Sequence, residues 1–248
     1  KRDRILEAFL QGALKTKIKI LEEDAGVHFL MKVDTNLSEE EFLDKMKSKG
    51  EFLDTRRKEA FLNIRRKNMK IKAEDTAALI IDFQEKLVPA IAEHDEIVAK
   101  AAIFAAGLKE FGVPMAVTQQ YTKGLGETVP AMKEAIGAFE PMEKTAFSAM
   151  DCDAFVEWVK AQGKKTILVC GVEAHICVLQ SIIDLIGEGY RVFIVADCVG
   201  SRMVYNKEYA IQRAVQEGAF VTTCEGALYE MTQGAGTPHF KAISKLTK

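Results

Sequence analysis

Short apolar runs recur between residues 76 and 223, and segments with helical periodicity separate them. The five runs are Thr76–Asp82, Val113–Thr118, Thr166–Gly171, Arg191–Asp197 and Ala219–Thr223. Their positions do not alternate between apolar and polar, which is typical of strands buried on both faces of a parallel sheet. Right-handed crossovers place helices on both sides of such a sheet. The pattern therefore predicts an α/β fold, a three-layer doubly wound parallel sheet.

A different pattern precedes this region. Apolar residues at helical spacing predict a helix over residues 5–10, and strand-forming residues predict strands over 17–21 and 27–33. Ser38, followed by three glutamates, is typical of a helix start, and Gly50 suits that helix's end. We therefore predict two parts: an α+β N-terminal appendage with a basic connector over residues 1–68, and the large domain over residues 69–248.

Composition narrows the class of protein. The chain has 248 residues, of which 48% are hydrophobic and 28% charged, with a formal net charge of −2. These values exclude a disordered chain and argue against a nucleic-acid-binding surface. No apolar run reaches the roughly 20 residues of a membrane span. Five cysteines without a CxxC pair favour free thiols in a reducing compartment, so we predict a cytoplasmic protein.

Three residues of the large domain carry candidate chemistry. Asp82 ends the first apolar run, Lys144 lies between the second and third runs, and Cys177 begins a helix after the third. A thiol near a helix N-terminus and a lysine favours the thiolate, and an aspartate can take its proton. Each residue alone has a plainer interpretation: a capping aspartate, a solvated lysine and a core cysteine. Only the predicted fold, which brings the carboxyl ends of the strands together, favours a shared site.

An ordered set of short motifs supports the shared site. The set comprises Ile81–Gln84, Thr118–Gly126, Glu143–Ser148, Gly171–Cys177, Asp197–Arg202 and Gly218–Gly226. With these motifs, residues 70–248 resemble the isochorismatase-like cysteine hydrolase superfamily, which has a Rossmann-like fold. Within it, the isochorismatase-domain-containing proteins are the most similar subgroup.

The resemblance implies a role for each candidate residue. Cys177 matches the nucleophile, Asp82 the general base and Lys144 the supporting cation. A cis peptide between Val172 and Glu173 is implied, with backbone N–H groups turned toward an oxyanion near Cys177. The implied reaction is hydrolysis of a small amide, carbamoyl or related C–N substrate through a thioester. The alternative is a non-catalytic or weakly active oligomeric binding or scaffold protein of the same fold.

Departures from the superfamily restrict the chemistry further. Isochorismatases themselves generally lack the cysteine, so Cys177 points away from isochorismate as the substrate. Nicotinamidases carry an Asp/His/His metal site after the second strand, where this chain has Gln119, Gln120 and Tyr121. We therefore predict no metal and no cofactor. Gln84, Gln120 and Tyr121 are the predicted substrate-binding residues, although ordinary loop polarity explains the last two equally well.

Other reactive side chains receive structural predictions. His175 is two residues from Cys177, a helical spacing that points the two side chains apart, so a structural or interface role is favoured. Asp197 is predicted to cap a helix or turn rather than to take part in catalysis. The remaining cysteines are predicted to be core thiols: Cys152, Cys170, Cys198 and Cys224. Members of this superfamily self-associate, which implies a homo-oligomer of unspecified subunit number that acts on a small molecule.

Residues 1–50 weakly resemble a fragment of the C-terminal domain of fold-type-I aminotransferases. The resemblance rests on residues 23–30 and 37–41. The large domain and the cofactor-binding lysine of that family are missing, so we predict no pyridoxal phosphate. A folded functional domain, a fusion remnant and a start site that belongs at Met69 are three open interpretations of residues 1–68.

Overall fold

The computed structural model describes residues 17–23, 29–34 and 70–248. The chain divides into two compact units, residues 1–67 and 68–248. In the first unit, β1 (Lys17–Glu23) pairs antiparallel with β2 (Phe29–Asp34). Both strands overlap the predicted ones. The predicted helices over 5–10 and 38–50 and the connector lie outside the described residues.

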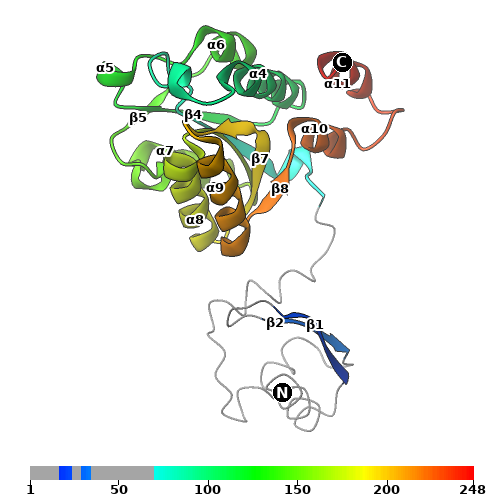
Figure 1. Ribbon diagram of the computed structural model, residues 1–248. Coiled ribbons are helices and arrows are strands. Elements are labelled where there is room, and N and C mark those ends of the chain that lie inside the picture. The colour runs from blue at the N-terminus through cyan, green and yellow to red at the C-terminus, as the bar shows by residue number, and fades with distance from the viewer. Residues whose placement is uncertain (1–16, 24–28, 35–69) are drawn as a thin grey trace. The chain divides into compact units, whose positions relative to one another are not determined.

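The second unit is built on a six-stranded parallel sheet (Figure 1). Its strands are β3 (Thr76–Ile81), β4 (Met115–Gln120), β5 (Met142–Lys144), β6 (Thr166–Val172), β7 (Arg191–Gly200) and β8 (Phe220–Thr222). Their spatial order is β5-β4-β3-β6-β7-β8, and every neighbouring pair is parallel. The predicted doubly wound α/β sheet is therefore confirmed. The short β5 is an addition to the five predicted strands.

Helices cover both faces of this sheet (Figure 1). One core cluster includes buried residues of α4 (His94–Glu110), α6 (Pro130–Ile136), α10 (Cys224–Thr232) and α11 (Phe240–Leu246). The other includes residues of α7 (Asp153–Gln162), α8 (Leu179–Gly187) and α9 (Val204–Glu217). The shorter elements are α5 (Thr122–Leu125), the 3-10 turns η1 (Ala73–Asp75), η2 (Val88–Ala90) and η3 (Ala149–Asp151), and the π-helical turn η4 (Ala174–Val178). No helix among the described residues is long and apolar enough to span a bilayer.

The central strands show why the apolar runs are continuous. In β3, Ala78 and Ile80 belong to one core cluster, whereas Leu79 and Ile81 belong to the other. Successive side chains of a strand point to opposite faces, and here a helix layer covers each face. Both sets of positions must therefore be apolar.

The strand order changes direction between β3 and β6. β4 and β5 continue outward from β3, whereas β7 and β8 continue outward from β6. Ligands of open parallel sheets bind at such a switch point, beyond the carboxyl ends of the strands. Asp82 follows β3 and η4 follows β6, so the candidate residues meet at this location.

Candidate active site

Asp82 begins the site at the end of β3. Its side chain is fully buried, and its φ of 54° places a non-glycine residue in the left-handed region. Oδ1 accepts a hydrogen bond of 2.7 Å from Thr118 Oγ1, and Oδ2 accepts one of 2.7 Å from Lys144 Nζ. Such backbone conformations gather at functional sites, where surrounding contacts hold them in place.

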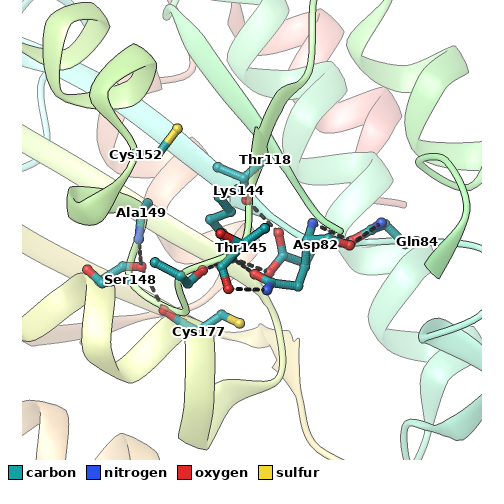
Figure 2. Close-up of polar contacts among 12 residues, drawn as sticks. Asp82, Gln84, Thr118, Lys144, Thr145, Ser148, Ala149, Cys152 and Cys177 are labelled. Carbon is teal, nitrogen blue, oxygen red and sulfur yellow. Dashed lines mark hydrogen bonds and ion pairs between the residues drawn. The ribbon is translucent and has the colours of Figure 1, made fainter. Parts of the chain in front are cut away.

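Lys144 ends β5 and directs a buried ammonium at Asp82 (Figure 2). Besides Asp82 Oδ2, Nζ donates to Gln120 Oε1 at 2.8 Å and to the Ala146 carbonyl at 3.4 Å. Three acceptors match the three protons of an ammonium. The plain interpretation of a solvated lysine is therefore wrong, because the cation is enclosed and fully partnered.

Cys177 lies in η4, directly after β6, and is 6% exposed. Burial raises the pKa of its thiol to about 12, and the negative charge of Asp82 raises this pKa further, while Lys144 opposes the shift. The charges of Asp82 and Lys144 therefore both act on the thiol. Lys144 favours the thiolate, as expected, but burial and Asp82 outweigh it, so the pKa of the thiol is raised where the sequence predicted a lowered one.

The peptide bond between Val172 and Glu173 is cis, as predicted. The Glu173 carboxylate accepts from the Arg202 main-chain N–H at 2.9 Å and from Arg202 Nε at 3.1 Å. Just before it, Gly171 has a φ of 142°, and a Cβ there would lie 2.3 Å from the Ile81 carbonyl oxygen. Only glycine permits β6 to approach the end of β3 this closely.

Gln84 is fully buried between β3 and the segment after β4. Its Nε2 donates to the carbonyls of Gln120 and Gly126, and its Oε1 accepts the Gln120 N–H at 2.7 Å. These bonds hold the end of β4, and the substrate-binding role of Gln84 stays a prediction.

Gln120 in turn holds Lys144. Its Oε1 accepts from Lys144 Nζ, and its Nε2 donates to the Thr145 carbonyl at 2.7 Å. These bonds assign Gln120 to the support of the ammonium in this structure. Tyr121 is 52% exposed, and its substrate-binding role stays a prediction.

The residues predicted to have structural roles lie in the large domain and make local contacts. His175 Nδ1 lies 3.0 Å from Ser201 Oγ, a structural contact on the side of η4 that faces α9. Asp197 Oδ1 accepts the Cys224 N–H at 2.7 Å and so caps the start of α10. All five cysteines are free and buried, including the predicted core thiols Cys152, Cys170, Cys198 and Cys224.

Two contributions to the site were not assigned from sequence. Thr118 is the register partner of Ile81, which places its hydroxyl beside Asp82. The Ala146 carbonyl is a main-chain group, and no side-chain pattern could reveal it. Within residues 70–248 and the two described strands of the first unit, no group of three or more His, Cys, Asp or Glu side chains could hold a metal ion.

Comparisons with known proteins identify relatives of this chain. The isochorismatase domain model matches residues 76–226. Isochorismatase domain-containing protein 2 of Danio rerio is 35% identical over 178 residues, which covers 71% of this chain and 89% of that protein. The solved MAR1 ribonuclease of Caenorhabditis elegans has a TM-score of 0.68 and 34% identity, and the match covers 71% of this chain and 91% of that one. Escherichia coli YcaC, described as an octameric hydrolase of unknown specificity, has a TM-score of 0.69 and 26% identity, with 73% and 90% covered.

Proposed function

This chain belongs to the isochorismatase family of hydrolases, and we propose that it is a cysteine hydrolase of small amides, carbamoyl compounds or related C–N substrates. The observation that carries the proposal is the buried Lys144–Asp82 pair acting on the Cys177 thiol. A nucleophile, a proton acceptor and a fixed positive charge at one place are the parts that acyl transfer through a thioester requires.

The first half of the proposed reaction forms the thioester. Cys177 Sγ attacks the substrate carbonyl carbon while its proton passes to the Asp82 carboxylate, and the carbonyl electron pair moves to oxygen. The Ile176 N–H already donates to the Glu173 carbonyl at 3.0 Å. We assign the oxyanion to the N–H groups that begin η4 before it, because the first N–H groups of a helix have no acceptor within the helix. Collapse breaks the C–N bond, and the leaving nitrogen takes the proton from Asp82.

The second half regenerates the enzyme. Asp82 accepts a proton from water as the water oxygen attacks the thioester carbon. Collapse then breaks the C–S bond, the acid product leaves, and the sulfur recovers its proton from Asp82. Because burial and the charge of Asp82 raise the pKa of the resting thiol, the proposed scheme couples proton transfer to the attack. Lys144 holds the accepting carboxylate in place and supplies positive charge to the sulfur.

Metal and cofactor do not enter this scheme. The positions at the end of β4, where the resemblance places the metal site of a nicotinamidase, are Gln119 and Gln120, and both amides bond to protein groups. Their donor chemistry does not fit a divalent-cation site built from carboxylate and imidazole.

The test is ammonia or amine release from a panel of small amides, ureides and carbamates. We expect turnover of at least one compound, lost to background in Cys177→Ala. Cys152→Ala is the matched control, because it removes another buried thiol outside the triad and should keep turnover. Equal turnover in wild type and Cys177→Ala would overturn the proposal, and a panel without turnover would favour the scaffold alternative.

We propose homo-oligomerisation and a cytoplasmic location as companion properties. The octameric state described for YcaC supports the first, and five free buried thiols agree with the second. Sedimentation velocity of the full chain tests self-association, and a single monomeric species at micromolar concentration would contradict it. Fractionation of the source cells tests the location.

A further inference from the structure

A pair of hydrogen bonds joins the segment after Lys144 to the helix after Cys177. The Ala149 N–H donates to Ser181 Oγ at 2.8 Å, and Ser181 Oγ donates to the Cys177 carbonyl at 2.7 Å. Ser181 and Ala149 are both fully buried, so water does not replace these bonds.

A second contact lies one turn further along α8. Ser148 Oγ donates to Asp184 Oδ2 at 2.5 Å and also accepts the Met150 N–H at 3.2 Å. Ser148 is 2% exposed. Residues 145–149 are therefore attached to α8 at two points spaced like neighbours on one helix face.

The attachment joins the two halves of the sheet. Lys144 comes from β5 in the first half, whereas Cys177 and α8 follow β6 in the second half. The Ala146 carbonyl, which accepts from Lys144 Nζ, belongs to the attached segment. Movement of this segment away from α8 would therefore shift the ammonium relative to the sulfur.

We propose that Ser181, assisted by the Ser148–Asp184 bond, is a positioning residue that sets Lys144 against Cys177. The inference deepens the proposed function, because it names residues that tune the same site. A hydroxyl bonded to the carbonyl four residues earlier is common within helices. The feature that distinguishes Ser181 is that it also accepts a main-chain N–H from the segment that directly follows Lys144.

Thr232 provides a matched control. It is buried at 2% exposure, and its Oγ1 donates to the Leu228 carbonyl at 2.7 Å within α10, the same internal bond that Ser181 makes. Thr232→Val therefore removes an equivalent hydroxyl without touching the Lys144 segment. A purely structural role for Ser181 would make the two hydroxyl deletions alike.

The experiment measures Cys177 alkylation by iodoacetamide from pH 7 to 10.5, with each cysteine followed by mass spectrometry. It compares the effect of Lys144→Met in three backgrounds: wild type, Ser181→Ala and Thr232→Val. We expect Lys144→Met to slow labelling about tenfold at pH 9, equivalent to about one pKa unit, in wild type and Thr232→Val. In Ser181→Ala the slowing should shrink to about threefold or less. Ser181→Thr, which keeps the hydroxyl, should restore the full effect.

An undiminished effect of Lys144→Met in Ser181→Ala would overturn the inference. If Ser181→Ala does not fold, Ser148→Ala takes its place in the same comparison and decides the result by the same criterion. Labelling needs no substrate, so the outcome is separate from amide turnover. If Ser181→Ala reduces the effect of Lys144→Met but no amide is turned over, the positioning role stands and the proposed hydrolysis is refuted. If amides are turned over but the effect of Lys144→Met is undiminished, the hydrolysis stands and the positioning role is refuted.

Discussion

Lys144 Nζ and Asp82 Oδ2 form an ion pair of 2.7 Å in which the side chains are 1% and 0% exposed. Removing one partner of such a pair leaves a buried charge without compensation, whereas removing both does not. This relationship leads to a stability test that is independent of any substrate.

Lys144→Met and Asp82→Leu should each lower the free energy of unfolding by about 3–5 kcal/mol. The double variant should be more stable than either single variant, because no unpaired charge remains. Urea unfolding followed by circular dichroism gives the three values. Lys133→Met, which breaks the exposed pair with Glu127, is the control and should cost less than about 1 kcal/mol. Additive losses in the double variant would argue against a coupled pair.

Asp82→Asn should separate thiol reactivity from turnover. After burial, the negative charge of Asp82 is the largest cause that raises the pKa of the Cys177 thiol. Its neutralisation should therefore lower that pKa below about 12 and accelerate alkylation of Cys177 at pH 8–9. Amide turnover should nevertheless disappear, because the proton acceptor is gone. Per-cysteine alkylation rates and product release measure the two effects, and slower alkylation in Asp82→Asn would contradict the electrostatic argument.

Alkaline pH should destabilise the fold through Cys177. The folded protein retains the thiol proton up to about pH 12, whereas the unfolded chain releases it near the ordinary value of 9.0. The unfolded state therefore binds fewer protons between these values, and stability falls as pH rises. Between pH 8 and 10.5, wild type should lose about 2 kcal/mol more than Cys177→Ala. Denaturant titrations at the two pH values check this, and parallel losses in both proteins would refute it.

Gly171→Ala should disrupt the junction between β3 and β6. An added Cβ would meet the Ile81 carbonyl oxygen at 2.3 Å, a main-chain atom that cannot turn aside. Gly112→Ala is the control, since its φ of 66° is also left-handed but nothing lies within 4 Å of the added atom. We expect the control to cost about 1–2 kcal/mol and Gly171→Ala several kcal/mol more or loss of soluble protein. Equal losses in thermal unfolding would show that crowding at Ile81 is unimportant.

The sequence predicted the elements whose signal is a continuous apolar run. β3 and β6 are buried along their whole length, so each of their positions contributes to the sequence pattern of a buried strand. β5 escaped prediction because it has three residues, of which only Lys144 is buried. The sequence alone does not distinguish a buried lysine from a solvated one, because the difference lies in the acceptors that surround its ammonium.

The site was predictable as a set of residues and less so in its energetics. Strand ends located Asp82 and Cys177, and the motifs supported Lys144 as their partner. The direction of the thiol pKa depends on how completely side chains exclude water, which no spacing expresses. In the sequence, Gln84 likewise resembles a polar residue without partners. In the structure, its amide donates hydrogen bonds to the main-chain carbonyls of Gln120 and Gly126.

The strand order divides the proposed chemistry between two stretches of chain. Asp82 and Lys144 precede the turn at Gly163, and Cys177 follows it. Neither stretch alone carries a complete constellation, and β3 and β6 are the strands that bring the two together. A chain cut at that turn would give two fragments, neither of which could catalyse the proposed reaction. Activity recovered on mixing them would show that the parallel pairing of β3 with β6 had re-formed.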